Sequence, residues 1–114
     1  MKQFGALSDP IRLRMVEQLA ERDATAGELS AVAGEEYGVS QPAASRHLRV
    51  LREAGLVSAR VDGSRRIYRL ERDAVEEIGE WADHLRALWA TSFSALGTEI
   101  SRGARRRQES GRSE

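Results

Sequence analysis

Residues 39–55, VSQPAASRHLRVLREAG, decide the fold that we predict for this chain. Ser40 is a good N-cap, because its hydroxyl can accept a hydrogen bond from a free backbone N–H of the first helical turn. Pro42 follows in that turn, where its missing N–H costs nothing, and Gly55 is a natural C-terminal stop. One apolar stripe at helical spacing lies between them: Ala44, Leu48 and Leu51. The stretch therefore predicts a short amphipathic helix.

The other faces of this helix are small, polar or basic, and no acidic residue precedes Glu53. Small residues allow close approach to a DNA major groove, while Gln and Arg side chains reach base edges or phosphates. The residues that we expect to bind DNA here are Ser40, Gln41, Ala43, Ser45, Arg46 and Arg49. An ordinary amphipathic surface helix is the alternative that this stretch alone leaves open.

Length and composition restrict the class of protein. The 114 residues suit one domain, which we expect over residues 1–100, followed by a disordered basic tail at residues 101–114. The absence of Cys excludes disulfides and thiolate metal sites and fits a reducing cytosol. No stretch approaches the ~20 apolar residues of a membrane span, and the N-terminus lacks a signal peptide's apolar core. We therefore expect a cytoplasmic protein with no membrane partner.

The formal net charge of zero hides a segregation of charge along the chain. Residues 1–39 carry 4 basic and 7 acidic side chains, residues 40–72 carry 8 and 3, residues 73–100 carry 1 and 6, and residues 101–114 carry 5 and 2. A nucleic-acid-binding protein needs a basic face rather than a basic total. Residues 40–72 contain the predicted helix, and their excess of basic side chains supplies such a face.

Three helices are predicted before this stretch, two of them from capping patterns. The apolar residues of segment 4–7 predict a short helix, too brief to be stable unless it docks on another element. Ser-Asp-Pro at residues 8–10 begins a second helix that runs to about Arg22. Thr25 with Glu28 forms a capping-box pattern that opens a third helix.

A turn is predicted at residues 34–38, GEEYG, after a third helix that carries Leu29 and Val32 inward. Two helices joined by a Gly-containing turn, the second with a polar front, form a helix-turn-helix. This predicted turn is about four residues longer than the tight version. The angle between the two helices is therefore left open.

After Gly55 the apolar period changes from that of a helix to that of a strand. Residues 56–61, LVSARV, and 66–70, RIYRL, predict two strands that flank a hairpin turn at residues 62–65. A hairpin directly after such a helix is the wing of a winged helix, and its arginines suit phosphate or minor-groove contacts. The wing residues that we expect to bind DNA are Arg60, Ser64, Arg65 and Arg66. A basic edge hairpin that simply prevents sheet aggregation is the alternative.

A long helical pattern with a continuous apolar stripe runs from Arg72 to Ile100 and includes both Trp residues. Its ~29 residues span roughly 43 Å, more than one short domain covers, and exposed apolar surface of that size usually marks an interface. We expect a dimerisation helix that packs with the N-terminal helix of a second copy; an intramolecular core helix is the alternative. The residues expected at the interface are Phe4, Leu7, Ile78, Trp81, Leu85, Leu88, Trp89, Phe93 and Leu96.

Three segments together resemble the ArsR/SmtB family of bacterial transcriptional repressors: LSDPIRLRMVEQLAE, ELSAVAGEEYGVSQPAASRHLRVLREAGLV and DGSRRIYRLERDAV. The resemblance runs from about residue 4 to 100. It implies a mainly α fold with a small β-hairpin wing, that is, a winged helix-turn-helix with a long C-terminal dimerisation helix. It also implies a homodimer that binds an operator with two-fold symmetry and blocks transcription. Gln41, Ser45 and Arg46 match the family's groove-facing positions, and His47 matches its recurrent SxHL histidine, which is generally structural.

The chain departs from the metal-sensing members of this family at their metal-binding motifs. Metal-sensing members carry a Cys-x-Cys type motif, or paired Asp/His ligands on the last helix. This chain has no Cys, and His84 lies near Asp83 and Glu80 with no second His at ligand spacing. It therefore resembles a branch without metal sites. We expect no metal and no cofactor, and any small-molecule effector is unknown.

Three classes of function remain to be compared. The first is a sequence-specific DNA-binding transcriptional regulator, a homodimeric (auto)repressor that binds double-stranded DNA at an inverted repeat through the helix 40–54 and the wing 56–70. The second is a winged-helix protein–protein interaction module that uses the Trp-bearing helix 72–100, although such a module does not need the basic segment 40–72. An enzyme is the weakest option, because no catalytic set of side chains can be assembled from these residues.

Overall fold

The computed structural model describes residues 2–95, so the expected tail at residues 101–114 and Leu96 of the expected interface lie outside the described residues. The chain divides into two compact units, residues 1–78 and the residues from 79 onward. The first unit contains four helices, three strands and the start of a fifth helix, α5. The four helices are α1 (Lys2–Leu7), α2 (Pro10–Glu21), α3 (Ala26–Tyr37) and α4 (Gln41–Glu53).

Side-chain caps begin these helices where the sequence predicts. The Asp9 carboxylate accepts from the backbone N–H groups of Ile11, at 2.8 Å, and Arg12, at 3.2 Å, ahead of α2. At the start of α3, the Thr25 hydroxyl accepts from the Glu28 backbone N–H at 3.1 Å. The Glu28 carboxylate accepts from the Thr25 N–H at 2.9 Å, which completes the capping box. At each of the two helix starts, the cap thereby satisfies two backbone N–H groups that have no partner within the helix.

The turn between α3 and α4 is shorter than the sequence predicts. Helix α3 continues to Tyr37, and only residues 38–40 separate it from α4. Gly34 remains helical, and Gly38 ends the helix with a φ of +68° while its N–H donates to the Gly34 carbonyl at 3.0 Å. A glycine tolerates that left-handed conformation, so one of the two glycines suffices to end the helix. The three-residue connection is that of an ordinary helix-turn-helix.

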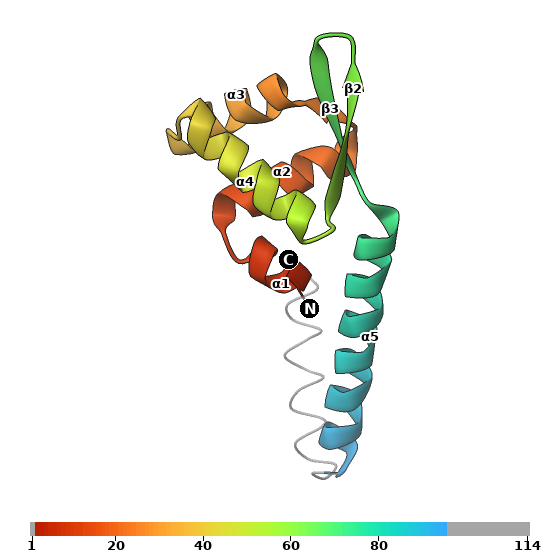
Figure 1. Cartoon of the computed structure of the whole chain (residues 1–114). Coiled ribbons are helices and arrows are strands. Elements are labelled where there is room, and N and C mark those ends of the chain that lie inside the picture. The colour runs from red at the N-terminus through yellow and green to blue at the C-terminus, as the bar shows by residue number, and fades with distance from the viewer. Residues whose placement is uncertain (1, 96–114) are drawn as a thin grey trace. The chain divides into compact units, whose positions relative to one another are not determined.

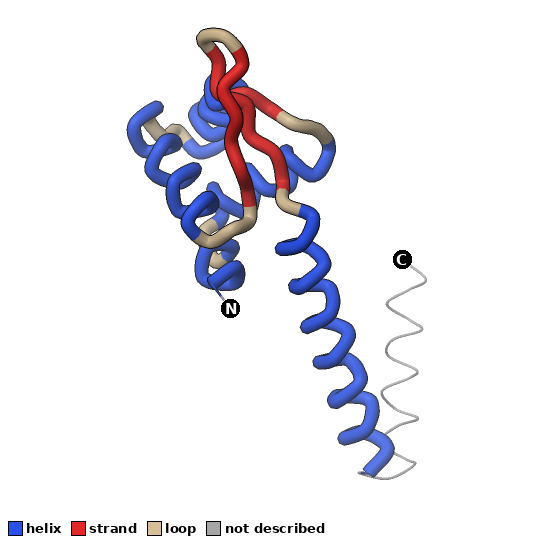
Figure 2. Tube along the Cα trace, turned by 45° about the vertical axis from the view of Figure 1, so that its right-hand side comes forward, coloured by secondary structure: helices blue, strands red, loops and turns tan. Residues whose placement is uncertain are grey.

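The wing belongs to a three-stranded antiparallel sheet in the order β1-β3-β2 (Figure 2). Strand β2 (Val57–Asp62) pairs with β3 (Arg65–Leu70), and Gly63 and Ser64 form a two-residue turn in which Gly63 has a φ of +65°. Such short hairpin turns require a positive φ at their first central residue. The third strand, β1 (Ala24–Thr25), pairs with Tyr68 and Ile67 of β3 and was not predicted. Two residues are too short for a strand period to be recognised in the sequence.

The core of the first unit is formed by apolar side chains from α2, α3, α4 and the base of the hairpin. Its fully buried large residues are Met15, Leu29, Leu48, Leu51 and Leu56. The predicted stripe of α4 is buried throughout, with Ala44 and Leu51 0% and Leu48 1% exposed. Leu29 is buried as predicted, whereas Val32 is only half-buried and Ala33 takes the second inward position of α3. The hairpin extends past the helices of this unit (Figure 1).

Helix α5 (Arg72–Ala95) begins in the first unit, where Ala74 is buried and Ile78 packs against the core. From residue 79 to Phe93 none of its described side chains is buried. Its exposed large apolar residues are Trp81 (45%), Leu85 (48%), Leu88 (52%) and Trp89 (61%). Within the described residues, no helix combines the length and apolarity needed to cross a membrane.

Candidate nucleic-acid interface

Helix α4 presents a polar front because its apolar back is buried in the core. The Ser40 hydroxyl accepts from the Ala43 backbone N–H at 3.2 Å, which fixes the first turn. Five of the six residues predicted to bind DNA on this helix are exposed, and Ala43 is half-buried. The structure therefore brings these six residues onto and beside one solvent-facing surface: Ser40, Gln41, Ala43, Ser45, Arg46 and Arg49.

The arginines of this helix have no carboxylate partner in the described part of the chain. Arg46 and Arg49 make no ion pair or hydrogen bond with residues 2–95 through their side chains, and neither does Arg52 one turn further on. Arg52 was not among the predicted site residues, although its place on the same helix was the available signal. Exposed guanidinium groups without an internal partner are available to bind phosphate or guanine.

The wing arginines fall into two groups, which the sequence did not reveal. Arg60 pairs with Asp23 at 3.3 Å, and Arg65 pairs with Asp62 at 3.5 Å. Arg66 forms no such pair among the described residues. The two paired arginines would have to exchange a carboxylate for a DNA phosphate, whereas Arg66 would not. Ser64, also predicted to bind DNA, lies exposed in the turn.

The register of the hairpin places Arg66 and the paired arginines on opposite faces. Arg66 lies opposite Val61, on the face whose other members, nearer the base, include the buried Val57 and Tyr68. Arg65, one position before Arg66, and Arg60, one position before Val61, point to the other face, because successive residues of a strand alternate. Val61 is 74% exposed, so the outer part of this face offers an apolar side chain next to an unpaired cation.

The base of the wing is fixed by a contact that sequence reasoning missed. The Ser58 hydroxyl donates to the Glu71 carboxylate at 2.5 Å, and the Glu71 backbone N–H donates to the Leu56 carbonyl at 2.8 Å. Glu71 immediately precedes α5, so these bonds join β2 to the start of that helix. The hairpin is thereby held at its base while its tip remains exposed.

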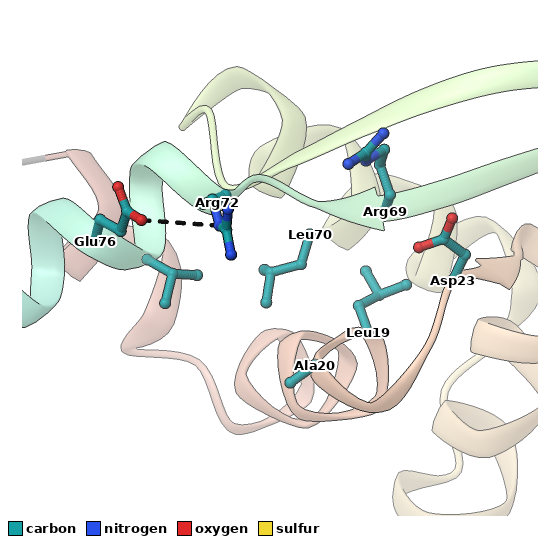
Figure 3. A pocket seen from close by; sticks show the side chains of 8 residues that line it. Leu19, Ala20, Asp23, Arg69, Leu70, Arg72 and Glu76 are labelled. Atoms are coloured by element: carbon teal, nitrogen blue, oxygen red, sulfur yellow. Dashed lines mark ion pairs between the residues drawn. The ribbon is translucent and has the colours of Figure 1, made fainter.

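An open hollow of about 340 Å³ lies on another part of the first unit, between α2, the end of β3 and the start of α5 (Figure 3). Leu19, Ala20, Leu70 and Val75 supply its apolar lining, and the charged residues around it are Asp23, Arg69, Arg72 and Glu76. Arg72 pairs with Glu76 at 3.8 Å. Because both signs of charge surround this hollow, it favours neither an anionic nor a cationic ligand.

The residues expected at a dimer interface differ in their surroundings. Leu7 and Ile78 pack partly against the core of their own chain, and Phe4 is half-buried. Four residues of α5 are exposed, as described above, and the Trp89 and Phe93 rings lie edge to face with centroids 4.7 Å apart. A cluster of three side chains able to hold a metal does not occur among the described residues. On α5, His84 is exposed, and the neighbouring Asp83 pairs with Arg86.

Comparison with known proteins decides the family. The family described as bacterial regulatory protein, arsR family, matches residues 9–59, which contain α2, α3 and α4. The transcriptional repressor SdpR of Bacillus subtilis is 31% identical over 78 residues, covering 68% of this chain and 82% of that protein. The chain belongs to the ArsR family. The resemblance inferred from the three sequence segments is therefore confirmed.

A further relative agrees with this chain in sequence and fold. The regulator Rv0081 of Mycobacterium tuberculosis is 39% identical over 75 residues, and the match covers 66% of this chain and 63% of that relative. The chain thus spans about three-fifths of that relative's length. The crystal structure of Rv0081 is 35% identical with a TM-score of 0.57, covering 78% of this chain and 86% of that one.

A solved domain of Mycobacterium bovis, Mb0332, described as a homodimeric winged helix-turn-helix DNA-binding domain, is 24% identical with a TM-score of 0.59. The match covers 75% of this chain and 76% of the Mb0332 chain. At that identity the likeness concerns the fold alone. The predicted fold class, a mainly α winged helix-turn-helix with a long C-terminal helix, is confirmed.

Proposed function

We propose that this ArsR-family chain is a sequence-specific DNA-binding transcriptional repressor, which acts as a homodimer on an inverted-repeat operator. The observation that carries the proposal is the front of α4, where Arg46, Arg49 and Arg52 are exposed without a carboxylate partner among the described residues. An interaction module that used only the Trp-bearing helix would not need such a surface. Each arginine can instead bind a phosphate, or bind guanine through two parallel hydrogen bonds.

The front of α4 and the wing take different parts in this proposal. Gln41 and Arg46 reach base edges from the N-terminal half of the helix, while Ser45 and Ala43 allow close approach to the groove. The wing contacts the flanking backbone through Ser64, Arg66 and, after exchange of their carboxylate partners, Arg60 and Arg65. Contacts of the second kind position the protein but carry little sequence information.

The exposed apolar stripe of α5 supports the homodimer. Trp81, Leu85, Leu88 and Trp89 recur at helical spacing and remain exposed in the single chain, and burial of such a stripe against a second copy would be favourable. We include Phe4, Leu7, Ile78 and Phe93 in the same interface. Two copies related by a two-fold axis would present two α4 helices to half-sites about one helical turn apart, or a multiple of it.

The domain boundaries that we propose differ from the division into two compact units at residues 78 and 79. We assign DNA binding and dimerisation together to residues 1–100 and a basic tail to residues 101–114. The tail and the last residues of that domain lie outside the described residues.

The first experiment measures binding of the purified protein to its own upstream DNA by fluorescence anisotropy, with scrambled DNA as the reference and at two salt concentrations. We expect the upstream DNA to bind about 10³-fold more tightly, or more, than the scrambled DNA. Equal and strongly salt-dependent binding to both would contradict a nearby operator. No binding at all would contradict the DNA-binding function and favour the interaction module.

Substitution of Arg46 tests the assignment of the groove-facing residue. We expect Arg46→Ala to lower the preference for the operator by ~1–3 kcal/mol if its guanidinium binds a guanine. Arg52→Ala removes the same charge from the same helix nearer its C-terminus and serves as the control, with a similar loss on operator and scrambled DNA. Competition titrations with single-base variants of the operator measure the difference. An unchanged preference in Arg46→Ala would contradict the assignment.

A further inference from the structure

One guanidinium group joins three helices of the first unit. Arg12, in the first turn of α2, donates through Nε to the carbonyl of Ala6 in α1 at 2.7 Å. Its Nη1 lies 3.1 Å from Nδ1 of His47 in α4. Both contacts are partly buried, and His47 directly follows Arg46 in the helix that we assign to the DNA groove. A single side chain therefore connects the N-terminal helix with the DNA-binding helix.

The chemistry of arginine fixes the direction of both hydrogen bonds. A guanidinium group has five N–H donors and no acceptor, so Nδ1 of His47 must accept and the imidazole carries its proton on Nε2. The planar guanidinium also holds its donors in a rigid fork. Because the two acceptors belong to different helices, a displacement of α4 relative to α1 would lengthen or bend at least one of the bonds.

The backbone that carries Arg12 is itself held in place. The Asp9 carboxylate accepts from the backbone N–H groups of Ile11 and Arg12. The side chain of Arg12 thus starts from a capped helix end rather than from a loop. Hydrogen bonds from a charged donor are stronger than those between neutral groups, so the loss of either bond has a measurable effect.

We propose that Arg12 is a positioning residue for sequence recognition, which fixes α4 against α1 through Ala6 and His47. In this role it touches no DNA, and it sets the orientation at which Gln41 and Arg46 enter the groove. The inference rests on the proposed function, because it concerns the same α4 surface. It adds that the N-terminal helix, to which we assign part of the dimer interface, is mechanically connected to the DNA-binding helix.

Three variants test the pair. Arg12→Lys keeps the charge, but its single nitrogen lacks the fork that reaches two acceptors. His47→Leu removes the acceptor, whereas His47→Asn keeps an amide oxygen near the position of Nδ1. We expect Arg12→Lys and His47→Leu each to lower the ratio of operator to scrambled-DNA affinity about tenfold, the effect of losing one charge-assisted hydrogen bond. His47→Asn should stay within about twofold of the wild type.

Each variant is compared at a temperature at which its circular dichroism melt shows it fully folded. Under that condition, a side chain that only stabilised the fold would leave the affinity ratio unchanged. The double variant Arg12→Lys with His47→Leu should be no weaker than either single variant, because both remove the same bond. Additive losses, equal losses on both DNAs, or a His47→Asn variant as weak as His47→Leu would each overturn the proposal.

The wild-type measurement distinguishes a failure of the proposed function from a failure of the role proposed for Arg12. If it prefers no operator over scrambled DNA, the proposed function fails and this inference fails with it. If it prefers the operator and Arg12→Lys retains that preference, the inference alone fails. Long-range ¹H–¹⁵N spectra of the free protein provide an independent readout, in which we expect the His47 proton on Nε2. A proton on Nδ1 would overturn the hydrogen bond itself.

Discussion

At the scale of single residues, Asp9 stabilises the start of α2 as an anion. Burial raises the pKa of this carboxyl, but the hydrogen bonds from the backbone N–H groups of Arg12 and Ile11 outweigh it, and the charge of Arg12 acts in the same direction as these bonds. The pKa of Asp9 therefore lies below its ordinary value. A carboxyl whose pKa is lowered in the folded state contributes stability above its unfolded pKa and loses it as the pH falls through the folded value.

The pH dependence of the Asp9→Asn variant tests this contribution. Asn keeps an oxygen acceptor for the helix cap but cannot ionise. We expect the variant to be less stable than the wild type at pH 7, and the difference to shrink as the pH falls below the ordinary Asp pKa of about 3.9 and through the lower pKa of folded Asp9. Urea unfolding at the two pH values measures it. Asp9→Ala, which removes the cap, should cost about 1 kcal/mol at pH 7. A wild-type advantage over Asn that persists at pH 2 would contradict the ionic role.

Residues that act within one helix were predictable, and residues that act between elements were not. The stripe of α4 and the caps at Ser40 and Thr25 depend on spacings of three or four positions, which a sequence displays directly. The contacts Arg60–Asp23 and Arg12–His47 join residues 37 and 35 positions apart. Nothing local indicates which of many arginines faces which acceptor. The sequence therefore indicated a basic wing but not which of its arginines is already paired.

At the scale of elements, the two glycines around residues 34–38 have different roles. Gly38 has a φ of +68°, which an L side chain rarely adopts, whereas a Cβ added at helical Gly34 would meet only the Val39 carbonyl oxygen at 3.6 Å. The pattern of two glycines with charged residues between them predicted a longer turn. The helix nevertheless continues, because the cost of one helical glycine, about 1 kcal/mol, is small beside the burial of Leu29 and Ala33.

Alanine substitutions at these glycines should have effects of opposite sign. We expect Gly38→Ala to destabilise the protein by about 1 kcal/mol, because the side chain strains the left-handed conformation. Gly34→Ala should be neutral or stabilise by up to about 1 kcal/mol through helix propensity. Chemical denaturation of the two variants beside the wild type gives both values. A larger loss in Gly34→Ala than in Gly38→Ala would mean that the boundary of α3 is wrong.

The wing offers a second comparison of neighbouring residues. Arg65 already neutralises Asp62, whereas Arg66 has no partner among the described residues. We expect Arg66→Ala to reduce the slope of log affinity against log salt by about one on any DNA, as for the loss of one phosphate contact. Arg65→Ala should reduce the slope less, because the Asp62 carboxylate already pairs with Arg65 and competes with a phosphate for its guanidinium group. Anisotropy titrations at several salt concentrations measure the slopes, and a larger effect of Arg65→Ala would contradict the division of the wing.

At the scale of the whole molecule, the proposed function requires two copies. One winged helix reads only one half-site, and a dimer links the two reading events so that the second occurs at a high effective concentration. Among the described residues, the exposed apolar stripe at helical spacing lies on α5. Dimerisation and operator affinity should therefore be lost together when the stripe is made polar.

Leu88→Asp is the variant that separates this role from folding. Leu88 is 52% exposed, so the substitution costs little within one chain but places a charge in the proposed interface. We expect a monomer in sedimentation velocity experiments and an operator affinity at least about tenfold lower. Ala87→Asp adds the same carboxylate one position earlier, about 100° around the helix from Leu88 and away from the stripe, and should remain a dimer. A dimeric Leu88→Asp variant with wild-type affinity would show that α5 is not the interface.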